Sequence, residues 1–303
     1  MKAFEHLWAV VVYVFDFLTF SSWSERPASQ QAVGAVGSAK HFDGDSPIFY
    51  PPNGPTGFQC DYSAMGPDWE PCSTPHRRGC WLKNATHEFN ITTDYEKWWP
   101  EGTLRRYQLN VSDMPLAPDG TTNPDGKVFN GMYPGPWIQA CWGDELEIEV
   151  TNNLKYNGTT VHWHGIRQLH TTEMDGVNGV TQCPIAPGRS FTYRFKAVQY
   201  GTSWYHSHYS LQYPDGLLGP LTIYGPSSAD FDEAIYPILM TDWNHQSAFK
   251  LFYQEITPGL GPPSMTNILL NGTGMQHGVG GPLQTDECRE TDRSRQTKRR
   301  RQG

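Results

Sequence analysis

Two pairs of histidines are the residues of this chain best suited to metal chemistry. His162 and His164 lie two positions apart in "TTVHWHGI", and His206 and His208 have the same spacing in "GTSWYHSHYS". Side chains alternate along a β-strand with a period of two, so each H-x-H pair places both imidazoles on one face. Imidazole is the commonest metal ligand in proteins, and two converging pairs predict one metal site built from all four histidines.

The residues around the pairs help to choose between metals. The aromatic neighbours Trp163, Trp204 and Tyr205 are expected to shield a buried site and to restrain the imidazoles, whose second ring nitrogens need carbonyl or carboxylate partners. A lone strand histidine is more often a surface or core residue, but two flanked pairs are harder to explain that way. Catalytic zinc takes three protein ligands and a water, and zinc hydrolases usually add a ligand directly after the pair. The residues after His164 are "GIRQL", so copper fits better than zinc.

Strands are the elements that must position these histidines. From about residue 103, "RRYQLNV", "DELEIEVTNN", "SFTYRFKAV" and "GPLTIYG" alternate or run apolar between Gly, Pro and Asn residues. Phe191, Tyr193, Phe195 and Ala197 share one face of a half-buried strand, and no helical periodicity competes. A run of roughly 120 such residues predicts an all-β fold, one complete Greek-key β-sandwich of ordinary domain size.

The rest of the chain divides by composition. The turn-rich residues 26–100 predict an irregular extension, and 101–228 form the sandwich domain. Residues 229–284 read as the start of a second domain, with strands in "YPILMTDWNH" and "TNILLNGTG". Residues 285–303 have no apolar periodicity and end in four basic side chains. A basic interaction tail is one interpretation, and a disordered end is the one that the composition favours.

The first 25 residues predict export. Lys2 precedes an apolar run, interrupted by Asp16, that resembles a secretory signal peptide and is too short to span a membrane. The 303 residues carry a formal charge of −8; seven basic and four acidic side chains lie in 285–303, which leaves −11 for the remainder. An acidic body argues against a nucleic-acid partner. We therefore expect a secreted, extracellular protein without a membrane or nucleic-acid partner.

Glycosylation sequons and cysteines fit the same compartment. Cys72 and Cys80 enclose a loop short enough for a local disulfide, whereas spacing leaves the pairing of the other four cysteines open. N-glycans are expected at five N-x-S/T triplets, which begin at Asn84, Asn90, Asn110, Asn157 and Asn271.

Two long segments carry a family resemblance. "VHWHGIRQLHTTEMDGVNGVTQCPIAPG" and "GTSWYHSHYSLQYPDGLLGPLTIYGP" resemble the first two copper-binding signatures of the multicopper oxidases, in particular the laccases of filamentous ascomycete fungi. "CSTPHRRGCW", "FNGMYPGPWIQACWGDELEIEV" and "NILLNGTG" extend the likeness over roughly 72–274. The resemblance implies plastocyanin-like (cupredoxin) domains, copper as cofactor, and oxidation of phenolic substrates such as p-diphenols with reduction of O2 to water.

The resemblance also assigns roles to individual residues. His162 matches a ligand of the type 2 copper of a trinuclear cluster, His164 and His206 match ligands of one type 3 copper, and His208 matches a ligand of the other. Asp175, in "EMDGV", matches an acid near that cluster. Reduction of O2 to two waters consumes four protons, which a nearby carboxyl group can relay. A structural role in a turn explains an Asp before Gly equally well.

The sequence also departs from the family. The two histidine signatures of the family's third domain have no counterpart, because His245 and His277 lie in no such motif and Cys288 has no neighbouring histidine. Cys183 resembles a cysteine that is disulfide-bonded to the C-terminal part of full-length enzymes. We therefore expect no type 1 copper site within these 303 residues. We expect a laccase fragment, truncated before the third domain and inactive alone. The alternatives are a non-catalytic copper-binding cupredoxin fragment and, less favoured, a zinc hydrolase.

Overall fold

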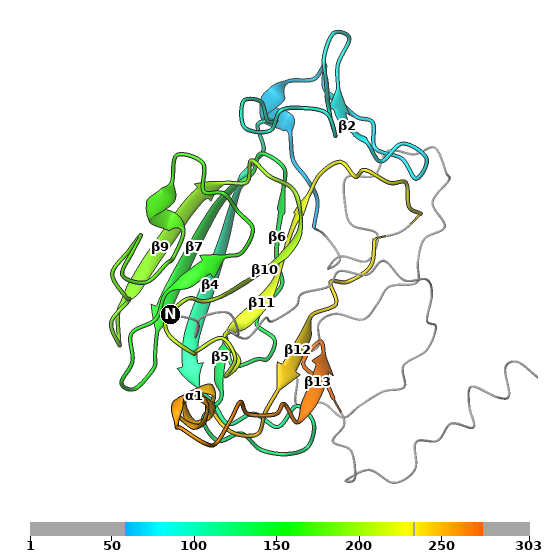
Figure 1. Ribbon diagram of the computed structural model, residues 1–303. Helices are drawn as coiled ribbons and strands as arrows, with labels where there is room; N and C mark the ends of the chain where they lie inside the picture. Colours follow the sequence, from blue (N-terminus) through cyan, green and yellow to red (C-terminus); the bar gives the residue numbers. More distant parts are fainter. Residues whose placement is uncertain (1–57, 233, 275–303) are drawn as a thin grey trace, which may run out of the picture.

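A computed structural model describes residues 58–232 and 234–274, and most of these residues form or connect β-strands. Residues 104–224 contain two four-stranded sheets, which face each other in Figure 1. In spatial order the first contains β5 (Lys127–Phe129), β4 (Leu104–Asp113), β7 (Glu145–Asn152) and β9 (Ser190–Lys196), and the second contains β6 (Ile138–Cys141), β11 (Leu218–Tyr224), β10 (Gly201–Ser207) and β8 (Val161–Trp163). The predicted all-β sandwich is confirmed.

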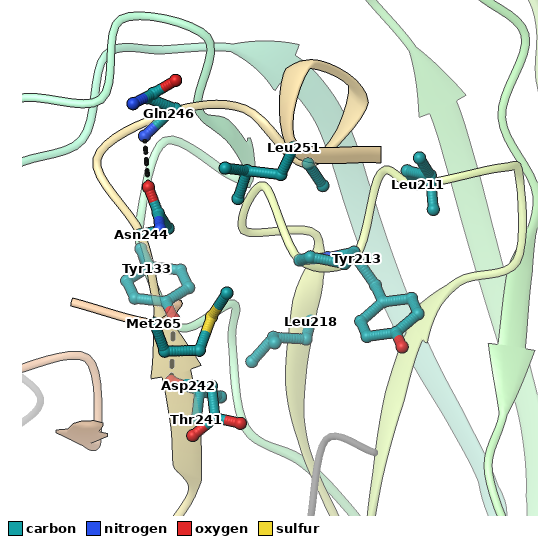
Figure 2. A pocket seen from close by; sticks show the side chains of 12 residues that line it. Tyr133, Leu211, Tyr213, Leu218, Thr241, Asp242, Asn244, Gln246, Leu251 and Met265 are labelled. Atoms are coloured by element: carbon teal, nitrogen blue, oxygen red, sulfur yellow. Dashed lines mark hydrogen bonds between the residues drawn. The ribbon is translucent and has the colours of Figure 1, made fainter. Parts of the chain in front are cut away.

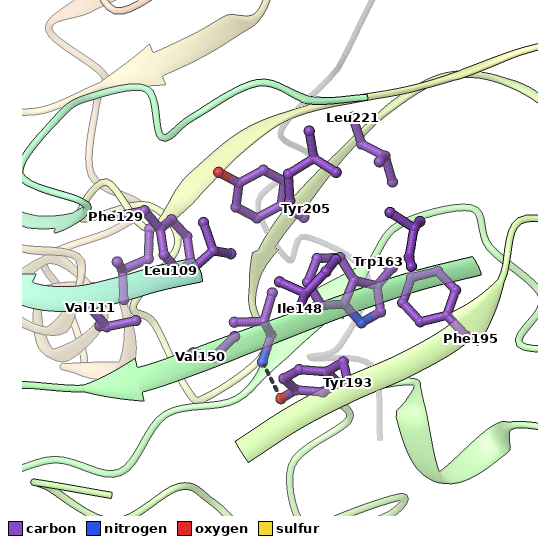
Figure 3. Packing of buried hydrophobic residues seen from close by; sticks show 14 of the residues in the cluster. Leu109, Val111, Phe129, Ile148, Val150, Trp163, Tyr193, Phe195, Tyr205 and Leu221 are labelled. Carbon is purple, nitrogen blue, oxygen red and sulfur yellow. Dashed lines mark hydrogen bonds between the residues drawn. The ribbon is translucent and has the colours of Figure 1, made fainter. Parts of the chain in front are cut away.

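The core between the sheets follows from the alternation of side chains along the strands. Every second residue of β7 is buried, and Ile148 is fully enclosed (Figure 3). In β9 the predicted face is the inner one, with Tyr193 and Phe195 buried. The hydroxyl group of Tyr193 accepts a hydrogen bond from the backbone N–H of Val161 at 2.9 Å, which ties β9 to the first residue of β8. Strand β8, which carries His162, is thus anchored to both sheets.

The described part of the predicted irregular extension contains a small sheet. Strands β1 (Glu70–Pro71), β2 (Cys80–Lys83) and β3 (Glu88–Asn90) pair antiparallel near one end of the sandwich (Figure 1). Strands of two to four residues are too short for an alternating pattern to be recognised, which explains the difference. The expected Cys72–Cys80 disulfide is present, and a second disulfide joins Cys60 to Cys141 at the end of β6.

Residues 234–274 add a two-stranded sheet and a helix to the described chain, as a second unit. Strands β12 (Met240–Trp243) and β13 (Asn267–Leu270) pair antiparallel in the two segments that the sequence predicts to be strands. Helix α1 (Ala248–Ile256) lies between them and was not predicted, because nine residues are fewer than the window over which a helical period is recognised. The signal peptide and the basic tail lie outside the described residues. Within the described segments, no helix has the length and apolar character needed to cross a membrane.

A buried carboxylate joins the second unit to the sandwich. The side chain of Asp119 has no exposed surface, and its Oδ2 atom accepts hydrogen bonds from His245 Nε2 at 2.8 Å and Asn267 Nδ2 at 3.2 Å. Burial raises the pKa of Asp119, but hydrogen bonds from His245, Asn267 and Thr121 outweigh it and lower the pKa overall. His245 therefore connects the second unit to the loop that carries Asp119.

A second buried carboxylate, Asp215, gives a pH-dependent prediction. Asp215 Oδ1 accepts a hydrogen bond from the Ala248 amide at 2.7 Å, while Lys127 Nζ stays 3.9 Å from Oδ2. Burial raises the pKa of Asp215 to about 6. Folding therefore favours the protonated Asp215 carboxyl group. Its contribution to the free energy of unfolding is fully present below the pKa of Asp215 in the unfolded chain, and it is lost as pH rises through about 6. We expect Asp215→Asn to raise the free energy of unfolding by on the order of 2 kcal/mol at pH 8 and little at pH 4.

Urea unfolding of both proteins at the two pH values measures this difference. Asp242→Asn, at an exposed carboxylate, is the matched control and should change the free energy of unfolding little. A less stable Asp215→Asn protein at pH 8 would show that attraction to Lys127 outweighs the cost of burying the charge.

Candidate metal centre

The four predicted histidines are brought together by the pairing of β8 with β10. The antiparallel register places His206 opposite His162. His164 and His208 follow directly after their strands and are fixed by backbone hydrogen bonds, from His164 N to Trp204 O and from His208 N to Thr160 O, each at 3.1 Å. The ring centroid of His162 lies 5.6, 5.4 and 5.4 Å from those of His164, His206 and His208, respectively.

The separation of two ring nitrogens fits a shared metal ion. His164 Nδ1 and His206 Nε2 lie 3.3 Å apart. Two nitrogens bound tetrahedrally to one ion, each at about 2.0–2.1 Å, are about 3.3–3.4 Å apart. The ligand atoms of His162, His164 and His206 all lie within 4.8 Å of one another. The arrangement can hold a metal ion without any movement of the backbone.

In His162 and His206, a hydrogen bond to a backbone carbonyl group decides which ring nitrogen is free to bind a metal. His162 Nδ1 lies 2.7 Å from the carbonyl oxygen of Asp175, and His206 Nδ1 lies 2.9 Å from that of Ser207. A carbonyl oxygen only accepts, so each Nδ1 carries the proton and each Nε2 keeps its lone pair. The proton on Nδ1 thus fixes the tautomer in which Nε2 can bind a metal.

The surroundings of His206 and His164 keep these two imidazoles neutral. Burial lowers the pKa of His206 to about 3, and the neighbouring histidines oppose its charge further. The pKa of His164 is lowered for the same reasons, with burial the larger cause. Metal ligation requires a neutral imidazole, so these two side chains are ready to bind at neutral pH.

The aromatic neighbours differ from the expectation. Trp204 does lie against the site, with its ring stacked on His206 at 4.1 Å between centroids. Trp163 and Tyr205 instead point into the sandwich core and are fully buried there. Shielding by those two was wrongly predicted, because a residue next to a histidine on a strand points to the opposite face.

Asp175 lies beside His162. Its Oδ1 atom is 3.3 Å from His162 Nδ1, and its carboxyl group is 23% exposed, so it is open to solvent. Gly176 is needed for this approach: its φ is +78°, and a Cβ atom there would overlap the carbonyl group of Val161. The structure therefore places the acid near the site and also shows the turn that the alternative interpretation requires.

Tyr213 also lies beside the cluster, although no sequence pattern indicates it. Its ring centroid lies 5.2 Å from that of His206 and 5.8 Å from that of Trp204. Tyr213 follows β10 in a loop, where no alternating pattern indicates the direction of a side chain. Its proximity to a histidine follows only from the path of the loop.

Comparison with known proteins decides the family of the sandwich. A family model for multicopper oxidases matches residues 110–228, a range that contains all four histidines. This region is a multicopper oxidase domain. The match agrees with the resemblance for this part of the chain, and copper is the metal that such a domain implies for the histidine cluster.

Fungal laccases are among the relatives of this multicopper oxidase domain. The chain is 51% identical over 222 residues to a laccase of Arthroderma benhamiae, a match covering 71% of the chain and 33% of the relative. It is 52% identical over 197 residues to Laccase-2 of Botryotinia fuckeliana, a match covering 65% of the chain and 32% of the relative. The crystal structure of the laccase from Botrytis aclada matches at 48% identity with a TM-score of 0.63. This match covers 69% of the chain and 38% of the solved laccase. The chain thus spans about a third of the length of these curated relatives.

Proposed function

We propose that this chain contributes to a laccase-type oxidase, in which phenolic substrates such as p-diphenols lose electrons and O2 is reduced to water. Its relatives named laccase support the reaction class. The observation that carries the proposal is the 3.3 Å separation of His164 Nδ1 and His206 Nε2, which suits a shared copper ion. Copper, when bound, supplies the redox chemistry toward O2.

The geometry supports a division of the ligands within a trinuclear site. His164 and His206 are the pair with facing nitrogens, as expected for two ligands of one type 3 copper. His162, which presents Nε2, would hold the type 2 copper. His208 would hold the second type 3 copper, and its ring lies 6.0 Å from that of His206. His162, His164, His206 and His208 then form half of an eight-histidine site, and the other four ligands would come from a further polypeptide segment.

Asp175 is proposed to hold a proton at the edge of this site. The carboxyl group lies next to His162 and also reaches solvent, so it can exchange protons with both surroundings. Four protons are consumed for each O2 reduced to water, and a positioned carboxyl group is a suitable general acid. His162 itself stays in one tautomer because its Nδ1 proton is held by the Asp175 carbonyl oxygen.

The alternative is a copper-binding domain without catalysis. Transfer of electrons from a phenol through a blue copper requires a cysteine thiolate ligand. Among the described cysteines four are in disulfides, and Cys183 is exposed on a loop. We therefore propose that the 303-residue chain binds copper but needs a further segment for turnover.

The purified 303-residue chain tests this function. We expect it to bind one or two copper ions, to show no thiolate–copper charge-transfer band, and to oxidise diphenols no faster than background. Metal analysis, visible absorption and O2 consumption measure the three outcomes. A chain that binds no copper would contradict the proposed site. Phenol-dependent O2 consumption by this chain alone would contradict the proposed division of ligands.

A further inference from the structure

A single indole ring lies against both imidazoles of the facing pair. Trp204 stacks on His206 with 4.1 Å between ring centroids and 28° between planes. The same ring lies 5.1 Å from the ring of His164 at 30°. The two imidazoles are 5.5 Å apart, so one flat surface supports both members of the pair.

His164 depends on this surface more than the other two clustered ligands do. His162 and His206 each donate a ring N–H to a backbone carbonyl group. Throughout residues 58–232 and 234–274, no carbonyl group accepts a hydrogen bond from the ring of His164. Its backbone is held, because Ser203 Oγ donates to the His164 carbonyl oxygen at 2.5 Å. The polar contact of its ring is with His206, whose Nε2 lies 3.3 Å from His164 Nδ1, and a metal shared by these two nitrogens would replace that contact. Contact with the indole is the further contact that orients the ring, and it stays in place when the two nitrogens bind a metal instead of each other.

The indole is itself held in place. Trp204 is 5% exposed and is buried with Leu218 and Leu239. Tyr213 packs edge-on against it, and Figure 2 shows Tyr213 and Leu218 in the wall of a pocket whose other wall includes Leu251. The indole therefore has few alternative positions, and a ring resting on it is equally restricted.

We propose that Trp204 is a positioning residue, which sets the orientation of His164 relative to His206 before a metal arrives. This inference rests on the proposed copper site at that pair. An imidazole that is already oriented loses little freedom on binding, so the indole raises metal affinity without touching the ion. Orienting partners outside the ligand set typically change metal affinity 10- to 100-fold.

Three variants of the full chain separate positioning from stability. Trp204→Leu removes the flat ring, Trp204→Phe keeps a smaller flat ring, and Trp243→Leu removes a buried indole from a different cluster. We expect Trp204→Leu to weaken Cu(II) binding by about 10- to 100-fold in competition with a chelator and to broaden the Cu(II) EPR spectrum. Trp204→Phe should restore most of both properties. Trp243→Leu should lower the unfolding midpoint and leave both unchanged.

Order of the His164 ring in the metal-free protein, measured by NMR relaxation, is an independent readout. The ring should be ordered in the wild type and in Trp204→Phe, and mobile in a folded Trp204→Leu protein. An unchanged ring in Trp204→Leu, or equal loss of affinity in Trp243→Leu, would overturn the positioning role. A wild-type chain that binds no copper, with the expected ring mobilities, would refute the copper site and leave the positioning role supported.

Discussion

Replacing His164 or His206 by alanine is expected to abolish copper uptake by the purified chain. The two side chains supply the nitrogens that lie 3.3 Å apart, so each substitution leaves one nitrogen of the pair. Loss of a partner outside the ligand set already costs about 10- to 100-fold in metal affinity, and loss of a ligand should cost at least about 100-fold. Equilibrium dialysis with Cu(II), followed by metal analysis, measures the effect.

Two other histidines are the controls for this experiment. His245 is bound to Asp119 between the two units, and His277 lies outside the described residues. His245→Ala and His277→Ala should leave copper uptake unchanged, although His245→Ala leaves Asp119 without one partner and should lower stability. Equal copper loss in all four variants would mean that the ion binds elsewhere.

Replacing Asp144 by alanine is expected to cause the largest loss of stability. The Asp144 side chain is fully buried and accepts three hydrogen bonds of 2.8 Å, from Arg105 Nε, the Thr103 amide and the Cys141 amide. Its removal leaves the Arg105 guanidinium, which is 20% exposed, without its carboxylate. Breaking a buried ion pair on one side typically costs about 3–5 kcal/mol. Denaturant unfolding of the disulfide-intact protein measures the loss.

An exposed ion pair on the same strands provides the control. Arg106 Nε and Glu147 Oε1 are 2.9 Å apart, but the Arg106 side chain is 69% exposed. Such pairs contribute about 0–1 kcal/mol, so Glu147→Ala should change the free energy of unfolding little. If Asp144→Ala were no more destabilising than Glu147→Ala, the buried pair would not stabilise the junction of β4 with the end of β6.

The sandwich could be predicted from the sequence because its strands carry a strong period-two pattern. In β7 and β9 that pattern alone identifies which side chains face the core. The elements that were missed are short: β1 to β3 have two to four residues each, and α1 has nine. Their positions follow from the disulfides and from packing against the larger domain, neither of which local periodicity records.

The candidate site was predictable in its residues but not in its geometry. Spacing alone shows that His162 and His164 share a face. It does not show that His206 lies opposite His162, since strand pairing is set by contacts far apart in the chain. The tautomers depend on the carbonyl groups of Asp175 and Ser207, whose positions come from turns and strand ends. Trp163 points into the core and Trp204 toward the site. Both directions follow from the alternation of side chains along a strand, because Trp163 is next to a histidine and Trp204 is two residues from one.

The pairing of His206 with His162 links metal binding to correct folding of the sheet. A slip of β8 by one residue along β10 would turn His162 into the core and Trp163 out to solvent. Chains with that error would lack the facing nitrogens and could not retain copper. A metal that binds only the native pairing lowers the free energy of that pairing alone. Copper present while the chain folds would therefore increase the fraction of molecules in which β8 is paired with β10 in the correct register.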